Sequence, residues 1–325
     1  MFVIASRSLE WTFMKRPLRY KLPKGNQDAL VERRTSVAGI LLDALDLLCN
    51  VRGVGWSWSP NPFPRESTPP PSIALLFFKM LLKMTAFDAS HYIIQRLHWH
   101  PSAANDPRGS SIFDPSLPLV PRTVLFAAIS GVCCGVWVYG MLDAVYHASA
   151  LVGRGVLRQP AAMWPRLFDR PWMSTSIQEF WSVRWHQLGR RLFIVFGARP
   201  GGRLFGKPGA VMGAFAVSAI LHYVALWGLG NGIDSITIGA FFLFMGAGAV
   251  MEGAFTRATG WRVRGWLGWS WTMLWTILWG TLMLDGWARH GMLASELFPI
   301  GPRPGKLVVD AIIALSSTFR SLIGY

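Results

Sequence analysis

Charge is scarce in this sequence, and acidic residues are scarcer than basic ones. Of 325 residues only 15% are Asp, Glu, Lys or Arg, whereas a typical soluble domain carries about 25%. Hydrophobic residues make up 52% of the chain, and the mean hydropathy is +0.33. This composition argues against a soluble globular protein and favours an integral membrane protein.

The sequence also lacks the marks of a secreted, disulfide-bonded protein. Its cysteines, Cys49, Cys133 and Cys134, give no disulfide framework, and no Asn-x-Ser/Thr acceptor is present. The first residues hold no apolar core long enough for a signal peptide, so we expect internal spans to direct membrane insertion. His98 and His100 have no Cys or carboxylate cluster at ligand spacing, and no metal site is predicted.

Most of the charges are positive, with 32 Lys and Arg against 17 Asp and Glu. They are grouped between apolar segments and form no single basic face, which disfavours nucleic acid as a partner. Anionic lipid headgroups and an anionic substrate fit this pattern better. Residues 1–35 are interpreted as a basic cytosolic lead-in, and residues 36–325 as one membrane domain.

Apolar stretches of membrane-crossing length follow one another along the chain. Residues 36–49 are helical but short and acidic, so they are expected at the interface. The fold class is therefore all-α and polytopic, with about five to seven transmembrane helices. The predicted spans are 73–94, 123–142, 210–229, 236–255 and 267–284, with a further apolar stretch at 307–323.

Basic residues set the expected orientation of these spans. Residues 151–208 hold ten Arg and Lys, residues 257–264 hold three, and the turn at 230–235 holds none. Both basic loops should be cytosolic by the positive-inside rule. His222 would then lie roughly 20 Å past the cytosolic boundary, at about 1.5 Å of helical rise per residue, so we expect a tunnel to reach it.

A cytosolic amphipathic helix carrying R-W-H-Q is predicted between Ser176 and Gly197. Ser176 and Glu179 have the spacing of a capping box, and Gly197 suits a helix end. Helical spacing would place His186 and Arg190 on one face. This helix therefore presents an imidazole beside a cation.

A second histidine lies in a very different sequence. From Ala210 to Trp227 there is no Lys, Arg, Asp or Glu, and the run contains His222. An ionisable residue inside a span is costly and is by default a functional candidate. The alternative is a histidine that only makes a hydrogen bond between helices.

Four stretches together resemble a known family. They are R-G-V-G-W at 52–56, W-P-R-L-F at 164–168, T-S-I-Q-E-F-W-S-V-R-W-H-Q-L-G-R-R at 175–191 and F-A-V-S-A-I-L-H at 215–222. They resemble the wax synthase-like branch of the membrane-bound O-acyltransferases, and the fungal members most, which carry Trp-His where plant wax synthases carry Trp-Asn. The likeness runs from about residue 36 onward. Ser182, Val183 and Ala219 depart from the usual pattern, and relatives often have one or two further N-terminal spans.

The resemblance implies a multi-pass protein of the endoplasmic reticulum that transfers an acyl group from acyl-CoA to a hydroxyl group. Fungal relatives include acetyltransferases of terpenoids and other secondary metabolites, so acetyl-CoA is the expected donor and a lipophilic alcohol the acceptor. Wax ester synthesis from a long-chain alcohol is the alternative. A transporter or non-catalytic adaptor would be a different class, and transport predicts ionisable residues in several spans. The clear spans offer one intramembrane histidine, which favours catalysis.

Roles follow from this chemistry. His222 is the predicted general base, because desolvation favours its neutral form. His186 is predicted to orient the thioester or the hydroxyl by hydrogen bonding, although it could be an interfacial histidine paired with Glu179 or Ser182. The residues predicted to shape the coenzyme A site are Arg184, Trp185, Gln187, Arg190 and Arg191. Their arginines could instead be topological signals that contact headgroups.

Overall fold

The computed structural model describes residues 12, 18, 36–59, 69–96, 109–113, 121–228, 235–294 and 303–315, with only the backbone for 121–127. Most of the basic lead-in, the His98 and His100 pair, the turn at 230–234 and the end of the last apolar stretch lie outside these residues. Every regular element in the described chain is helical, which confirms the all-α fold class. The helices are α3 (Val37–Cys49), α4 (Ile73–Arg96), α6 (Pro121–Leu151), α7 (Ile177–Glu179), α8 (Arg190–Leu192), α9 (Arg199–Trp227), α10 (Ser235–Thr259), α11 (Gly265–Arg289) and α12 (Pro304–Leu315).

Short 3-10 and π-helical segments lie between or continue these helices. They are η1 (Val152–Val156), η2 (Ala161–Met163), η3 (Pro171–Met173), η4 (Phe180–Arg184), η5 (Phe193–Ala198) and η6 (Met292–Ala294). The stretch predicted as a basic loop at 151–208 is thus largely helical.

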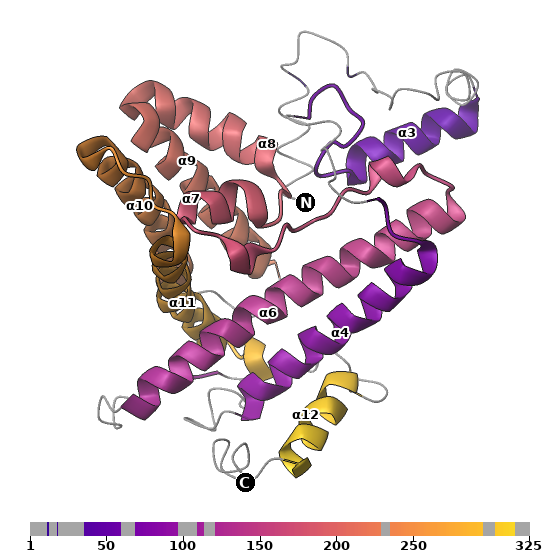
Figure 1. Cartoon of the computed structure of the whole chain (residues 1–325). Coiled ribbons are helices and arrows are strands. Elements are labelled where there is room, and N and C mark those ends of the chain that lie inside the picture. The colour runs from indigo at the N-terminus through magenta and orange to yellow at the C-terminus, as the bar shows by residue number, and fades with distance from the viewer. Residues whose placement is uncertain are drawn as a thin grey trace.

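Two groups of helices make up the molecule (Figure 1). The long helices α4 and α6 lie side by side, and α12 packs on α4. Helices α9, α10 and α11 form the other group, and α11 also contacts α6. Gly140 of α6 lets the first pair approach closely, since a Cβ there would lie 2.9 Å from the Lys83 carbonyl oxygen. His222 of the candidate site lies on α9, within the second group.

A helical hairpin occupies the region just before the predicted span at 210–229. Helical geometry is interrupted at Phe205 (φ −131°) and at Gly206, whose φ of 64° favours glycine. A new arm begins at Lys207, with Pro208 in its first turn, where proline is well tolerated. The second arm therefore starts close to the position that the sequence predicted.

The two arms of the hairpin pack through pairs of glycines. A Cβ at Gly197 would lie 2.3 Å from the Gly213 carbonyl oxygen, and one at Gly201 would lie 2.2 Å from the Gly209 carbonyl oxygen. Such contacts require small residues spaced four apart on each arm, as at close helix crossings in membranes. The prediction that Gly197 ends a helix is therefore wrong, because this glycine lies inside η5 and serves packing.

Three helical stretches of the described chain are long and apolar enough to cross a membrane. They are Ala128–Val156, Arg190–Trp227 and Ser235–Thr259. The second includes the hairpin, so it does not run as one straight helix. Helices α4 and α11 are comparably long, but charged residues in α4 and tryptophans in α11 lower their hydropathy. The polytopic membrane class is confirmed, and the total number of spans stays a prediction.

Buried ionisable residues are more numerous in these helices than the sequence suggested. Asp143 is buried in α6, with Lys83 at 3.5 Å, and Glu252 is buried in α10. The prediction of one intramembrane histidine as the sole ionisable group was therefore wrong, so that contrast no longer separates catalysis from transport. Both carboxylates have polar partners within the protein, which lowers the cost of burying them.

Candidate functional site

The segment that bears R-W-H-Q starts at a well-capped helix end. The Glu179 amide donates to Ser176 Oγ at 3.0 Å, as the capping box predicts. The Glu179 carboxylate accepts from the Thr175 amide at 2.8 Å and from Thr175 Oγ1 at 3.0 Å, one residue earlier than the motif requires. Burial opposes the charge of Glu179, but the hydrogen bonds from Thr175 and Arg184 outweigh it and lower the pKa of this carboxyl.

The predicted continuous helix between Ser176 and Gly197 is broken at the R-W-H-Q sequence. The helix ends with Arg184 in η4, and Trp185 has an extended backbone with ψ of 161°. Gly189 has a φ of 70°, which allows the chain to turn before Arg190 starts the next helix. His186 and Gln187 therefore lie in a connecting loop, and the shared helical face predicted for His186 and Arg190 does not exist.

Aromatic contacts bring the family-like stretches together around this loop. The Trp185 ring is stacked on Phe180 at 5.2 Å and meets Phe168 edge-on at 5.0 Å between centroids. Trp181 meets Phe215 of the last stretch at 5.9 Å. These packing contacts account for the aromatic residues of W-P-R-L-F and F-W-S-V-R-W-H.

The R-G-V-G-W stretch joins the same assembly through its arginine. Arg52 Nη1 donates to the carbonyl oxygens of Pro165 at 2.8 Å and Arg166 at 3.0 Å. Trp56 is buried and donates to Asp46 of α3 at 2.7 Å. All four stretches that carry the resemblance are thus structurally connected, although they are far apart in sequence.

His186 is held among aromatic rings, and one of its nitrogens is unused. Its ring lies 5.8 Å from that of Phe168 and 5.7 Å from that of Trp185. Nδ1 is buried and has no hydrogen-bond partner among the other described residues. Burial, followed by the nearby charge that His222 would carry, lowers the pKa of His186 to about 3. The imidazole is therefore neutral at physiological pH and available to a ligand.

His222 lies close to His186 on the second arm of the hairpin. The two are near enough for the charge of one to affect the titration of the other, and the His222 ring packs on Phe242 of α10 at 4.4 Å. His222 Nδ1 lies 2.8 Å from the Ser218 carbonyl oxygen. A carbonyl oxygen can only accept, so Nδ1 carries the proton and Nε2 has a free lone pair.

This tautomer alone does not single out His222. His147 and His290 make the same bond to the carbonyl four residues earlier, at 2.6 and 2.8 Å. What distinguishes His222 is its nearness to His186 and its aromatic surroundings. An open apolar groove of about 240 Å³ lies between α9 and α10, lined by Ala219, Ile220, Tyr223, Ser235 and Gly239, and His222 is not among its lining residues.

The five residues predicted for the coenzyme A site differ in how many of their polar groups are already bonded within the protein. Arg184 is paired with Glu179 at 2.7 Å and also bonds the Asp169 carbonyl oxygen at 3.2 Å. Trp185 is part of the aromatic packing, and Gln187 Nε2 donates to its carbonyl oxygen at 2.8 Å. These roles are structural and leave little capacity for a phosphate.

The other two arginines have different surroundings. Arg191 Nη1 donates to the Trp58 carbonyl oxygen at 2.6 Å. Arg190 is exposed and bonds neutral oxygens, Gln187 Oε1 at 2.9 Å and the Ser182 carbonyl oxygen at 3.2 Å. No carboxylate pairs with Arg190 in the part of the chain that the structure describes. Arg190 is therefore the best placed of the set to meet an anion.

The sequence reasoning missed one residue that touches this region. Glu252 of α10 accepts from the backbone amides of Ile177 and Gln178, at the start of α7. A lone acidic residue inside the apolar run 236–255 was the available signal, since such a residue needs a partner.

Comparison with known proteins supports the class that this fold indicates, a polytopic helical membrane protein. Residues 164–244 match the membrane bound O-acyl transferase family. The matched segment contains both histidines, and it confirms the predicted resemblance to this family.

Relatives of this chain fit the wax synthase-like branch. The O-mevalon transferase yanI of Aspergillus niger is 28% identical over 161 residues, covering 46% of this chain and 34% of that protein. Acetyltransferase ple2 of Rhodocybe pseudopiperita is 25% identical over 317 residues, 88% of this chain and 75% of that protein. A long-chain-alcohol O-fatty-acyltransferase of Simmondsia chinensis is 27% identical over 125 residues, 36% and 35% of the two chains. The alignment thus spans about a third of the first and third of these relatives.

Proposed function

We propose that this protein transfers an acyl group from acyl-CoA to the hydroxyl group of a lipophilic acceptor, with acetyl-CoA as donor. The observation that carries the proposal is the combination of His186, whose buried Nδ1 has no partner among the other described residues, and the nearby His222, whose Nε2 is free to accept a proton. The similarity to acetyltransferases of two fungi supports the acetyl donor. A terpenoid or another secondary metabolite is the proposed acceptor, and the endoplasmic reticulum is the proposed location.

His222 acts as the general base in this scheme. Its Nε2 takes the proton of the acceptor hydroxyl while that oxygen attacks the thioester carbonyl carbon. The carbon–oxygen bond forms, the carbon–sulfur bond breaks, and the departing thiolate receives the proton from His222. The bond from Nδ1 to the Ser218 carbonyl keeps the accepting nitrogen unprotonated and stabilises the imidazolium that forms transiently.

His186 orients a reactant in this scheme. Its buried Nδ1 has no partner among the other described residues, and a buried polar atom is stabilised by any ligand group that satisfies it. A neutral imidazole can donate from one nitrogen and accept at the other, so it can hold the thioester carbonyl or the acceptor hydroxyl. Arg190, with donors facing solvent, is proposed to contact a phosphate of coenzyme A.

Wax ester synthesis is the second candidate, favoured by the similarity to the long-chain-alcohol enzyme of Simmondsia chinensis. The same two histidines would serve a fatty acyl donor. The groove between α9 and α10 is mainly apolar, which suits either a terpenoid or an alkyl chain. The two candidates differ in the donor and acceptor, and the chemistry at the histidines is common to both.

An assay in yeast microsomes separates these candidates. Labelled acetyl-CoA and palmitoyl-CoA are supplied with pooled sterols, terpenoids and fatty alcohols, and wild type is compared with His222→Ala at matched protein level. We expect label from acetyl-CoA in an ester formed only by wild type. Label from palmitoyl-CoA in a fatty alcohol would favour wax synthesis. Absence of any ester from well-expressed wild type would contradict the acyltransferase proposal.

A further inference from the structure

A buried carboxylate outside the family-matched segment contacts the histidine-bearing region. Glu252 lies in α10, eight residues past the end of the match at 244, and only 6% of it is exposed. The proposed acyl transfer gives it no chemical role. Burying a carboxylate in an apolar helix is costly unless its oxygens are satisfied, so its partners indicate what it does.

Among the described residues, all the hydrogen-bond partners of the Glu252 carboxylate are N–H groups. Oε1 accepts from the Ile177 amide at 2.7 Å and from Trp271 Nε1 at 3.0 Å, and Oε2 accepts from the Gln178 amide at 3.1 Å. Among the described residues no basic side chain pairs with it. The carboxylate therefore caps the amides at the start of α7 from another helix, where a negative charge is favourable.

Two close contacts fix the same end of α7 onto α10 and α11. A Cβ at Gly248 would lie 2.5 Å from Ile177 Cδ1, so Ile177, which is fully buried, fills the space left by this glycine. A Cβ at Gly268 would lie 2.3 Å from the Thr175 carbonyl oxygen. We call Glu252, Gly248 and Gly268 the α7 seat. The α7 seat therefore fixes the position at which the segment that bears R-W-H-Q begins.

The seat is linked to His186 by a short, braced stretch of chain. From Gln178 to His186 there are eight residues, most of them in η4, and the Glu179 to Arg184 ion pair closes the turn. Trp181 in this stretch meets Phe242, the ring on which His222 packs, at 6.4 Å. A shift of α7 would therefore move His186 relative to His222.

We propose that Glu252 is a positioning residue for acyl transfer, holding α7 on α10 so that His186 faces His222. The inference rests on the proposed function for its kinetic consequence, but the geometry that it asserts can be tested without activity. A displacement of the order of 1 Å can cost about 100-fold in rate, so the expected effect is large although Glu252 touches no reactant.

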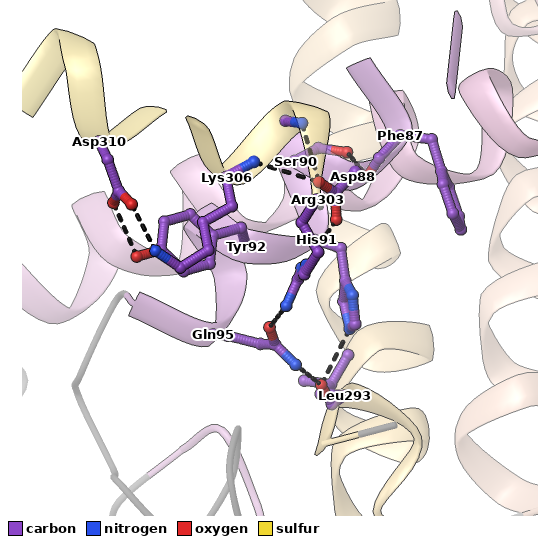
Figure 2. A network of polar contacts seen from close by, with 11 residues as sticks. Phe87, Asp88, Ser90, His91, Tyr92, Gln95, Leu293, Arg303, Lys306 and Asp310 are labelled. Carbon is purple, nitrogen blue, oxygen red and sulfur yellow. Dashed lines mark hydrogen bonds and ion pairs between the residues drawn. The ribbon is translucent and has the colours of Figure 1, made fainter. Parts of the chain in front are cut away.

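The chain offers a matched control in a second carboxylate that caps a helix from outside. Asp88 of α4 is also buried, and its Oδ2 accepts from the amides of Gly305 and Lys306 at the start of α12, at 2.8 and 3.1 Å (Figure 2). Its neighbours in Figure 2 come from α4, α12 and η6, and the two histidines of the site are not among them. Substituting either carboxylate should lower the stability of the protein, whereas only substitution of Glu252 should change the geometry of the histidine site.

The test uses the full chain in nanodiscs with Glu252→Gln, Glu252→Asp and Asp88→Asn. Glutamine keeps the size but turns one acceptor into a donor facing an amide N–H. We expect Glu252→Gln to speed hydrogen exchange at the amides of 177 and 178, and to raise labelling of His186 by diethyl pyrocarbonate at least threefold. We expect kcat of Glu252→Gln to fall roughly tenfold or more, with KM for acyl-CoA little changed. Glu252→Asp should recover part of the lost kcat. Asp88→Asn should leave His186 labelling unchanged.

Each outcome decides the proposal. Normal exchange at 177 and 178 with normal His186 labelling in folded Glu252→Gln would overturn it, as would unchanged kcat. If this variant does not fold, Trp271→Phe removes one of the three donors and should produce a smaller change of the same kind. If wild type itself makes no ester, the acyltransferase proposal fails, and exchange and labelling still decide whether Glu252 holds His186 in place.

Discussion

Two groups of polar residues in this protein differ in how many of their hydrogen-bond donors and acceptors have partners. Around Asp88, His91 and Arg303, most donors and acceptors are paired: His91 Nε2 donates to the Leu293 carbonyl oxygen at 2.9 Å, and Arg303 Nε donates to Asp88 at 2.8 Å (Figure 2). Around His222 the surroundings are aromatic, and His186 Nδ1 has no partner in the described chain. A histidine thus contributes to stability in the first group, whereas in the second group a histidine nitrogen is available to a ligand.

This difference indicates which of the two groups is the better candidate for a substrate site. A polar cluster whose atoms are mostly paired lowers the free energy of the fold and leaves few atoms for a substrate. In the α4–α12 cluster, Arg303 Nη2 is one such atom without a partner among the described residues. A buried nitrogen without a partner costs stability unless a ligand supplies one. On this reasoning the α4–α12 cluster fastens the chain, and the histidine pair is where a substrate would be bound and changed.

Substitutions of His186 and of His91 should have opposite consequences: the first should lower turnover, and the second should lower stability. His186→Ala should lower turnover by about 100-fold, the scale of losing one acid–base or orienting group. His91→Ala should keep turnover within a few-fold of wild type and lower the free energy of unfolding by about 1–3 kcal/mol, because Leu293 loses a donor. Ester formation and thermal unfolding on the same preparations check both. Equal losses of turnover in the two variants would contradict the comparison.

Removing the charge of Asp88 should give the largest loss of stability. Asp88→Asn leaves Arg303 without its carboxylate and weakens the cap on α12, so we expect a loss of about 3 kcal/mol. Asp310→Asn is the comparison, since its pair with Lys306 is partly exposed and should contribute about 0–1 kcal/mol, with one neutral hydrogen bond from Tyr92 lost or weakened as well. Denaturant titration followed by tryptophan fluorescence measures both. Similar stabilities for the two variants would show that the cluster does not fasten α12.

A comparison of two arginines sharpens the proposed donor site. Arg190→Gln should raise KM for acyl-CoA about tenfold, the effect of one lost charge-assisted hydrogen bond, and the difference should shrink as salt is added. Arg184→Gln should affect KM much less, because its guanidinium is already paired with Glu179. Initial rates over a range of acyl-CoA concentrations test this. A larger KM effect at Arg184 would reverse the assignment.

A further effect concerns the pH dependence of stability. Because the pKa of His186 is lowered to about 3 from the usual 6.5, the unfolded chain binds a proton on this ring over that interval and the folded chain does not. The contribution of His186 to stability is therefore highest above about pH 6.5 and falls as pH decreases, with a slope approaching about 1.4 kcal/mol per pH unit. Unfolding free energies of wild type and His186→Ala between pH 7 and pH 5 measure it. Parallel curves would contradict the burial of this imidazole.

Sequence patterns were sufficient for the class, and they made the two histidines candidates, but they did not predict the local structure around these histidines. The charge-free run around His222 predicted an apolar helix, because hydropathy is a property of consecutive residues. Spacing predicted one helix through His186, yet Trp185 and Gly189 adopt other backbone conformations, since packing of Trp185 on Phe168 and Phe180 outweighs helical propensity. Local rules contain no term for such distant contacts.

Glycines and carboxylates show the same limit. Gly197 suits a helix end by local preference, but here it is required because Gly213 approaches it from the opposite arm of the hairpin. Asp143 directly follows the predicted span at 123–142, where a charged residue would be expected at the interface, and it is buried beside Lys83 and His147. In each case the deciding partner is distant in the sequence, so the residue's own neighbours could not indicate its role.

The most direct measurement compares two histidines with the same local hydrogen bond. His222 and His290 each donate from Nδ1 to the carbonyl four residues earlier, at 2.8 Å, and of the two only His222 is near enough for its charge to affect the pKa of His186. Purified wild type, His222→Ala and His290→Ala are mixed with labelled acetyl-CoA and an acceptor alcohol, and ester and free coenzyme A thiol are quantified over a single turnover. The account predicts that His222→Ala forms neither product above background, while His290→Ala matches wild type. Ester formation by His222→Ala at the wild-type rate would contradict it.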